Sequence, residues 1–141
     1  MKHNRILLAA LLALSASHAD AGVVVITHAS TKVQALSANE VRQIFLGASR
    51  ELPDGTRIEA VEQPDASPLR HTFQETVLRK NDEQLRAWWT RVVFTGKGYP
   101  PKALGSSAEV MRRVAEKPGF IGYVDSKELN GAQFTVLYTA P

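Results

Sequence analysis

The sequence contains no cysteine among its 141 residues. That absence excludes disulfide bonds, thiolate chemistry and attachment of a lipid to a cysteine. A domain that folds outside the cytoplasm without disulfides depends on an ordinary hydrophobic core. About 120 residues follow the first 21, enough for one domain that buries roughly two-thirds of the surface of its unfolded chain.

Histidine and clustered charge are also scarce. Beyond residue 21 the histidines are His28 and His71, and two histidines without cysteine make a poor metal-binding set. The formal net charge is +3, and it falls to +2 when Lys2, Arg5 and Asp20 are left out. The basic residues are interleaved with acidic ones, so we expect no nucleic-acid partner. Because histidine is scarce and cysteine is absent, we expect no metal site, and we also expect no cofactor.

The longest apolar run lies near the N-terminus, at Ile6–Leu14. It follows the basic residues Lys2 and Arg5 and precedes small and polar residues. This three-part order is typical of a secretory signal peptide, and the run is too short to span a bilayer.

An A-x-A cleavage site fits Ala19 to Ala21, and cleavage after Ala19 fits nearly as well. We therefore expect residues 1–21 to be a signal peptide and residues 22–141 to form one periplasmic domain. No later run is apolar for long enough to anchor the mature protein, so we expect no membrane-spanning segment.

Strand signals are distributed along the whole mature chain. The β-branched run Val23–Thr27 is typical of a strand that is covered on both faces. Further strands are predicted near Ile58, at Phe120–Val124, where Gly122 indicates a close backbone approach, and at Phe134–Tyr138 after an Asn130-Gly131 turn.

Helix starts are indicated by capping residues at Ser37, Ser67, Asp82 and Ser106. The resulting order β-α-β-α-α-α-β-β predicts an α/β domain in which helices flank a small mixed sheet. In the third helix, Leu85, Trp88, Trp89 and Val92 fall at helical spacing. We expect one tryptophan to be in the core and the other to point outward, although a ligand platform remains an alternative.

The stretch of greatest functional interest is Arg57–Phe73, a strand, a polar loop and a helix start. Ser67 is a preferred N-cap and Pro68 suits the first helical position. Unpaired N–H groups and the helix dipole favour an anion at such an end, where Arg70 and His71 are placed to supply side-chain donors. The same residues also suit an ordinary surface helix without a ligand.

Asp65, Ser67 and His71 are the only set of residues that resembles a nucleophile with its base. Ser67 and His71 stand four apart in the first turn of one helix, which does not give the nucleophile–base–orienter geometry of a hydrolase. We therefore predict no catalytic residues and no enzyme.

Several segments occur in a characteristic order: L-S-A-N-E-V-R-Q-I-F-L-G at 36–47, P-D-G-T-R-I at 53–58, W-W-T-R-V-V-F-T-G-K-G-Y-P-P at 88–101 and E-V-M-R-R-V-A-E-K-P-G-F-I-G-Y-V-D at 109–125. With the strand–loop–helix at 58–73, they resemble phosphate-type substrate-binding proteins of ABC transporters. That resemblance covers nearly the whole mature chain. It implies the type 2 periplasmic binding protein fold, a small oxyanion such as phosphate as ligand, and a transporter or sensor in the inner membrane as partner.

The full-length proteins resembled have two lobes that close on the ligand. The mature chain is long enough for about one lobe. The resemblance therefore implies a single lobe at 22–141, the second of the two, which keeps two crossing strands at Val23–Thr27 and Phe134–Tyr138.

The phosphate binders carry an arginine, three further residues and then Ser-Gly-Thr at the anion loop. In this chain Gln63 replaces the arginine, Ser67 retains the serine, and Pro68 and Leu69 replace the glycine and threonine. Losing an arginine that pairs with a dianion removes several kcal/mol of binding, and Arg70 is placed to compensate.

Two functions therefore remain open from the sequence. The first is weak oxyanion binding through Gln63, Ser67, Arg70 and His71. The second is a non-catalytic periplasmic interaction module that has lost solute binding, because three of the four loop residues of the phosphate binders are replaced.

Overall fold

The structure, a computed structural model, describes residues 22–129 and 133–141. The predicted signal peptide and the predicted Asn130-Gly131 turn lie outside the described residues. The strands are β1 (Val23–His28), β2 (Glu59–Glu62), β3 (Lys102–Ala103), β4 (Phe120–Asp125) and β5 (Phe134–Thr139). The helices are α1 (Ala38–Phe45), α2 (Pro68–Phe73), α3 (Asp82–Phe94) and α4 (Ser107–Glu116), with a π-helical segment at Gln74–Leu78 and a 3₁₀ turn at Ser126–Glu128.

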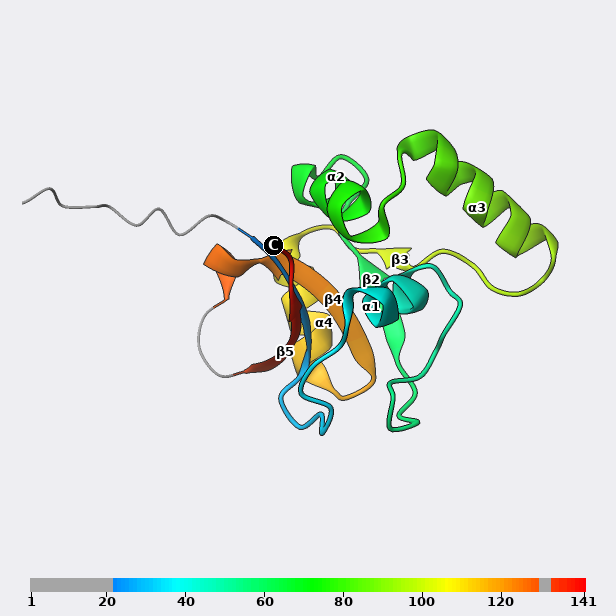
Figure 1. The fold of residues 1–141 in the computed structure, drawn as a ribbon. Coiled ribbons are helices and arrows are strands. Elements are labelled where there is room, and N and C mark those ends of the chain that lie inside the picture. Colours follow the sequence, from blue (N-terminus) through cyan, green and yellow to red (C-terminus); the bar gives the residue numbers. More distant parts are fainter. Residues whose placement is uncertain (1–21, 130–132) are drawn as a thin grey trace, which may run out of the picture.

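The five strands form one mixed sheet in the order β3-β2-β4-β1-β5, with helices packed against it (Figure 1). β2 runs parallel to β3 and β4, whereas β1 is antiparallel to β4 and β5. The predicted α/β architecture is confirmed. The sequence did not predict β3, because its two residues carry no pattern of their own and are ordered by pairing with β2.

The hydrophobic core occupies both faces of the sheet. Val23 and Val25 of β1 belong to the cluster that includes Phe45 and Phe73, while Val24 and Ile26 belong to the cluster under α4. Alternate residues of a strand point to opposite faces. The continuous apolar run of β1 is therefore buried on both sides, as predicted.

Gly122 lets α4 lie directly on β4. A Cβ atom added at Gly122 would lie 2.7 Å from Val110 Cγ1 and 3.1 Å from Val61 Cγ2, closer than packed side chains tolerate. The predicted close approach is confirmed, and it fixes α4 against the middle of the sheet.

Helix α1 has the predicted ends. The Ser37 hydroxyl accepts the Glu40 N–H at 3.1 Å, and Gly47 follows the C-cap with a φ of +76°.

The predicted start of α3 is wrong by one residue. Asn81 is the N-cap and forms a reciprocal capping box with Gln84, so Asp82 is the first residue of the helix.

Helix α3 lies at the periphery of the molecule (Figure 1) and only Val92 among its residues is buried. Trp88 is half-buried against the core, and its indole N–H donates to the Leu46 carbonyl at 2.9 Å. Core packing of one tryptophan is thus confirmed. The expected outward position of the other is wrong, because Trp89 is also half-buried, with its ring against Gly47.

Candidate functional site

The candidate anion site begins where β2 ends. The chain leaves the sheet at Glu62, turns through residues 63–66 and enters α2 at Ser67. Ser67 is extended and its hydroxyl accepts the Arg70 N–H at 3.4 Å, while Pro68 occupies the first helical position. The predicted helix start is confirmed. We call residues 63–71 the Ser67 loop.

Gln63 stands in the position of the arginine of the phosphate binders, but its side chain is turned into the protein. It is 2% exposed. Its amide nitrogen donates to the Tyr123 carbonyl at 2.8 Å, and its amide oxygen accepts the Ser107 hydroxyl at 3.1 Å. Both ends of the amide are thus occupied by β4 and α4, which gives Gln63 a structural position under the loop.

Arg70 is held by the loop itself. Its guanidinium donates to the Gln63 carbonyl at 2.9 Å and forms an ion pair with Asp65 at 2.5 Å. Asp65 is almost fully exposed. An oxyanion at this loop would therefore compete with the Asp65 carboxylate for the Arg70 charge.

His71 lies one residue further along α2. Its Nε2 is 3.1 Å from a carboxylate oxygen of Glu75, one turn along the helical segment, and both side chains are more than half exposed. Asp65 thus contacts Arg70, Ser67 contacts a backbone N–H, and His71 contacts Glu75. The three side chains are not joined in a nucleophile–base chain.

A buried carboxyl group lies beneath the loop. Glu62 accepts the Gln63 N–H at 2.9 Å and also accepts the Tyr123 hydroxyl. Burial raises the pKa of Glu62, against the lowering effects of the Tyr123 hydrogen bond and the Arg70 charge. Burial also raises the pKa of Tyr123, with a further contribution from Glu62. Tyr123 is fixed by stacking on Phe73, with ring centroids 3.8 Å apart.

Sequence reasoning missed the Glu62–Tyr123 pair, although two signals were available. The alternation of β2 places Glu62 on the same face as Ala60, which packs on the core. A tyrosine inside a buried central strand also needs a partner for its hydroxyl. Together these signals indicate a buried acid–phenol contact.

The Ser67 loop therefore offers one serine hydroxyl and one arginine that is already paired, while the Ser67 and Arg70 N–H groups donate within the loop, to the Pro64 carbonyl and the Ser67 hydroxyl. Arg70 faces the acids Asp65 and Glu62, so the local potential favours an anion less than the sequence suggests. Across residues 22–129 and 133–141, no group of three or more histidine, aspartate or glutamate side chains is arranged to hold a metal ion. Within the same ranges, no helix has the length and apolarity needed to cross a membrane.

The family model described as "PBP superfamily domain" matches residues 19–137. The fold and the strand–loop–helix junction together define a periplasmic-binding-protein lobe. The chain belongs to this PBP superfamily. No curated protein matches the sequence.

Several solved structures have a similar fold. One is a candidate phosphate ABC transporter substrate-binding protein from Clostridium perfringens with bound phosphate, at 20% identity and a TM-score of 0.67. An ABC-type phosphate transport receptor from Vibrio cholerae has 11% identity to this chain and a TM-score of 0.66. PstS from Borrelia burgdorferi has 14% identity and a TM-score of 0.63.

Each comparison covers 83% of this chain but only 44%, 45% and 46% of those three chains. The chain therefore spans less than half the length of these proteins, consistent with a single lobe.

Proposed function

We propose that this chain is an exported, non-catalytic binding domain that holds a small oxyanion weakly at the Ser67 loop. The observation that carries the proposal is the architecture of the junction in this lobe: β2 leads through a short loop into a helix start that keeps the serine as its N-cap. A relative with this fold was solved with bound phosphate. Phosphate is therefore the first oxyanion to test.

Binding is expected to be weak for two reasons. The position of the lost arginine holds the uncharged and buried Gln63, and the Arg70 charge is partly neutralised by Asp65. In a single lobe the anion stays partly solvated, so each contact acts at a high effective dielectric constant. We expect dissociation constants of about 0.1–10 mM.

The proposed place of action is the periplasm. Residues 1–21 have the three-part pattern of a signal peptide, and the proposed mature domain comprises residues 22–141. A domain of this family in that compartment would act beside a transporter or sensor of the inner membrane, which we propose as its partner.

The direct test is an NMR titration of the isotope-labelled mature protein with phosphate and sulfate at low ionic strength. We expect saturable shifts of the amide signals of Ser67, Leu69 and Arg70. Arg70→Ala should weaken binding by about 1–3 kcal/mol, and Ser67→Ala by less, about 0.5–1.5 kcal/mol. Arg112→Ala, an exposed arginine on α4, is the control. Absence of saturable shifts, or equal effects of Arg70→Ala and Arg112→Ala, would reject the site.

A second candidate is the interaction module, and specific observations favour it. Gln63 and Arg70 are satisfied within the chain, and α3 exposes Phe94 at 90% and Val93 at 52%. A photo-crosslinker at position 94 in the periplasm should then give one defined adduct with a membrane protein. The same crosslinker at position 112 should give none.

A further inference from the structure

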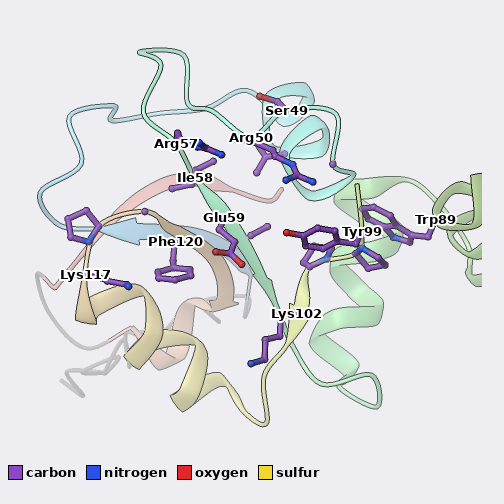
Figure 2. Close-up of a pocket in the computed structure, with 17 residues that line it drawn as sticks. Ser49, Arg50, Arg57, Ile58, Glu59, Trp89, Tyr99, Lys102, Lys117 and Phe120 are labelled. Carbon is purple, nitrogen blue, oxygen red and sulfur yellow. The ribbon is translucent and has the colours of Figure 1, made fainter. Parts of the chain in front are cut away.

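A second concave site lies at the opposite end of β2 from the Ser67 loop (Figure 2). It has a volume of about 590 Å³ and is bounded by the start of β2, the segment between α1 and β2, Trp89, and the turn before β4. Pockets for small organic ligands in proteins have volumes of about 300–1,000 Å³. The cavity is therefore large enough for an organic molecule rather than a single inorganic ion.

The charge of this cavity is strongly asymmetric. Its lining includes the cations Arg50, Arg57, Lys102 and Lys117 and a single acid, Glu59. The ion pairs found in the described part of the chain are Arg70–Asp65 and His71–Glu75, so none of these four cations has a carboxylate within 4.0 Å there. An excess of three positive charges around a concave surface attracts anions.

Aromatic rings hold two of the cations in place. The Arg50 guanidinium lies 5.2 Å from the centre of the Tyr99 ring, and the Lys117 ammonium lies 5.7 Å from the centre of Phe120. A cation–π contact positions a cation without cancelling its charge. Trp89 and Tyr99 both line the cavity (Figure 2), where they offer ring surface for stacking.

We propose that this cavity binds a small organic anion that combines a planar ring with two or more anionic groups. The ring would pack against Trp89 and Tyr99, and the anionic groups would meet Arg50 and Arg57, whose planar forks match carboxylate and phosphate oxygens. A single inorganic anion would reach only part of the cation set, because Figure 2 shows Lys102 and Lys117 at separate places around the rim.

Glu59 should make this cavity favour ligands that carry a hydrogen-bond donor in addition to their anionic groups. It is an exposed acid among the cations. A ligand with a hydroxyl or amino donor can meet its carboxylate, whereas a purely anionic ligand is repelled. The cavity is separate from the Ser67 loop, since neither Ser67 nor Arg70 lines it.

The position of the tryptophans allows a specific binding assay. The chain has two tryptophans, and Trp89 lines the cavity while Trp88 does not. In a Trp88→Phe variant the remaining indole therefore reports on the cavity, and a Trp89→Phe variant is the matched control. ATP supplies a ring with several anionic groups, adenosine supplies the ring alone, and tripolyphosphate supplies the anionic groups alone.

We expect ATP to quench Trp88→Phe saturably and to leave Trp89→Phe nearly unchanged. Adenosine and tripolyphosphate should each bind at least about tenfold more weakly. Calorimetry of the wild-type protein with ATP should give the same affinity. Equal binding of adenosine and ATP would overturn the charge requirement, and equal binding of tripolyphosphate and ATP would overturn the ring requirement.

Variants of the charged residues locate the ligand. Arg57→Gln should weaken ATP binding about tenfold, and Glu59→Gln should strengthen it by about threefold. Arg112→Gln removes the same charge outside the cavity, so it should leave the affinity unchanged. No saturable quenching below about 10 mM, or equal effects of Arg57→Gln and Arg112→Gln, would overturn the proposal.

Discussion

At the end of β2, Glu62 is a buried carboxyl group whose neighbours act on its pKa in opposite directions. Burial raises the pKa most, and the exposed Asp65 raises it further. The Tyr123 hydroxyl, the Arg70 charge and the Gln63 N–H lower it. Because burial dominates, the folded protein binds this proton more tightly than the unfolded chain does.

The first prediction is that Glu62 makes stability fall as the pH rises. At a pH well below the ordinary glutamate pKa of 4.5, both the folded and the unfolded state carry the proton. Above that pH the unfolded chain ionises first, so the free energy of unfolding falls until the pKa of the folded state is reached. The loss is about 1.4 kcal/mol for each pH unit that separates the two pKa values. Glu62→Gln cannot ionise, so its stability should rise relative to that of the wild type as the pH increases across this window.

Urea denaturation of both proteins between about pH 4 and pH 8 measures this effect. Glu59→Gln is the control, because Glu59 lies on the same strand but is exposed. A stability difference between Glu62→Gln and the wild type that does not change with pH would contradict the proposed burial effect.

At the scale of the elements, α3 depends on its tryptophans for attachment. Trp88 packs on the core and donates a hydrogen bond to Leu46, whereas Trp89 covers Gly47 at the edge of the cavity. Few other side chains of α3 reach the core, and Val92 is its only buried residue. The two tryptophans therefore anchor the helix unequally.

The second prediction compares these tryptophans. Trp88→Ala should lower the free energy of unfolding by about 2–4 kcal/mol, less than a fully buried tryptophan because the ring is half-exposed. Trp89→Ala should lower it by about 1 kcal/mol. Denaturant melts of the two variants measure the difference. A larger loss for Trp89→Ala would show that α3 is attached through its other face.

Local signals explain which elements could be predicted from the sequence. The caps at Ser37 and Ser67 and the β-branched run of β1 act within a few residues, so the sequence contains them completely. The two-residue β3 exists only through its pairing with β2. No local pattern could have predicted it.

The candidate site was less predictable because its contacts join distant parts of the chain. Gln63 was expected to face a ligand, yet its partners Tyr123 and Ser107 lie 60 and 44 residues away. The pairing of Arg70 with Asp65 spans five residues, and it depends on a loop conformation that spacing does not specify. The sequence correctly predicted the loop between β2 and α2, but it could not show which partners the side chains of the loop contact.

At the scale of the whole molecule, residues 22–129 and 133–141 fold as one lobe, and we propose that the chain is exported. The fold covers less than half of each of the three solved structures compared above, and among the residues that the structure describes no second lobe lies over the Ser67 loop. High solvation of that site is the physical basis of the weak binding that we propose.

The third prediction concerns export. Expressed from its full sequence in a Gram-negative bacterium, the protein should be recovered from the periplasm and begin at Gly22 or Asp20. Mass spectrometry of the purified protein measures the N-terminus. Replacing two leucines of the Ile6–Leu14 run with arginine should keep it in the cytoplasm at full length. Recovery of the unaltered chain with Met1 in the cytoplasm would contradict the prediction.

The central claim is that the Ser67 loop retains a weak oxyanion site whose arginine is held by the chain's own acid. The most direct measurement is the phosphate affinity of Asp65→Asn against that of the wild type, followed by NMR at low ionic strength. Removing the competing carboxylate should strengthen binding by about threefold to fivefold. Asp54→Asn, which removes an exposed charge at a distant turn, should leave the affinity unchanged. Undetectable binding in both proteins, or an Asp65→Asn affinity no higher than that of Asp54→Asn, would contradict the claim.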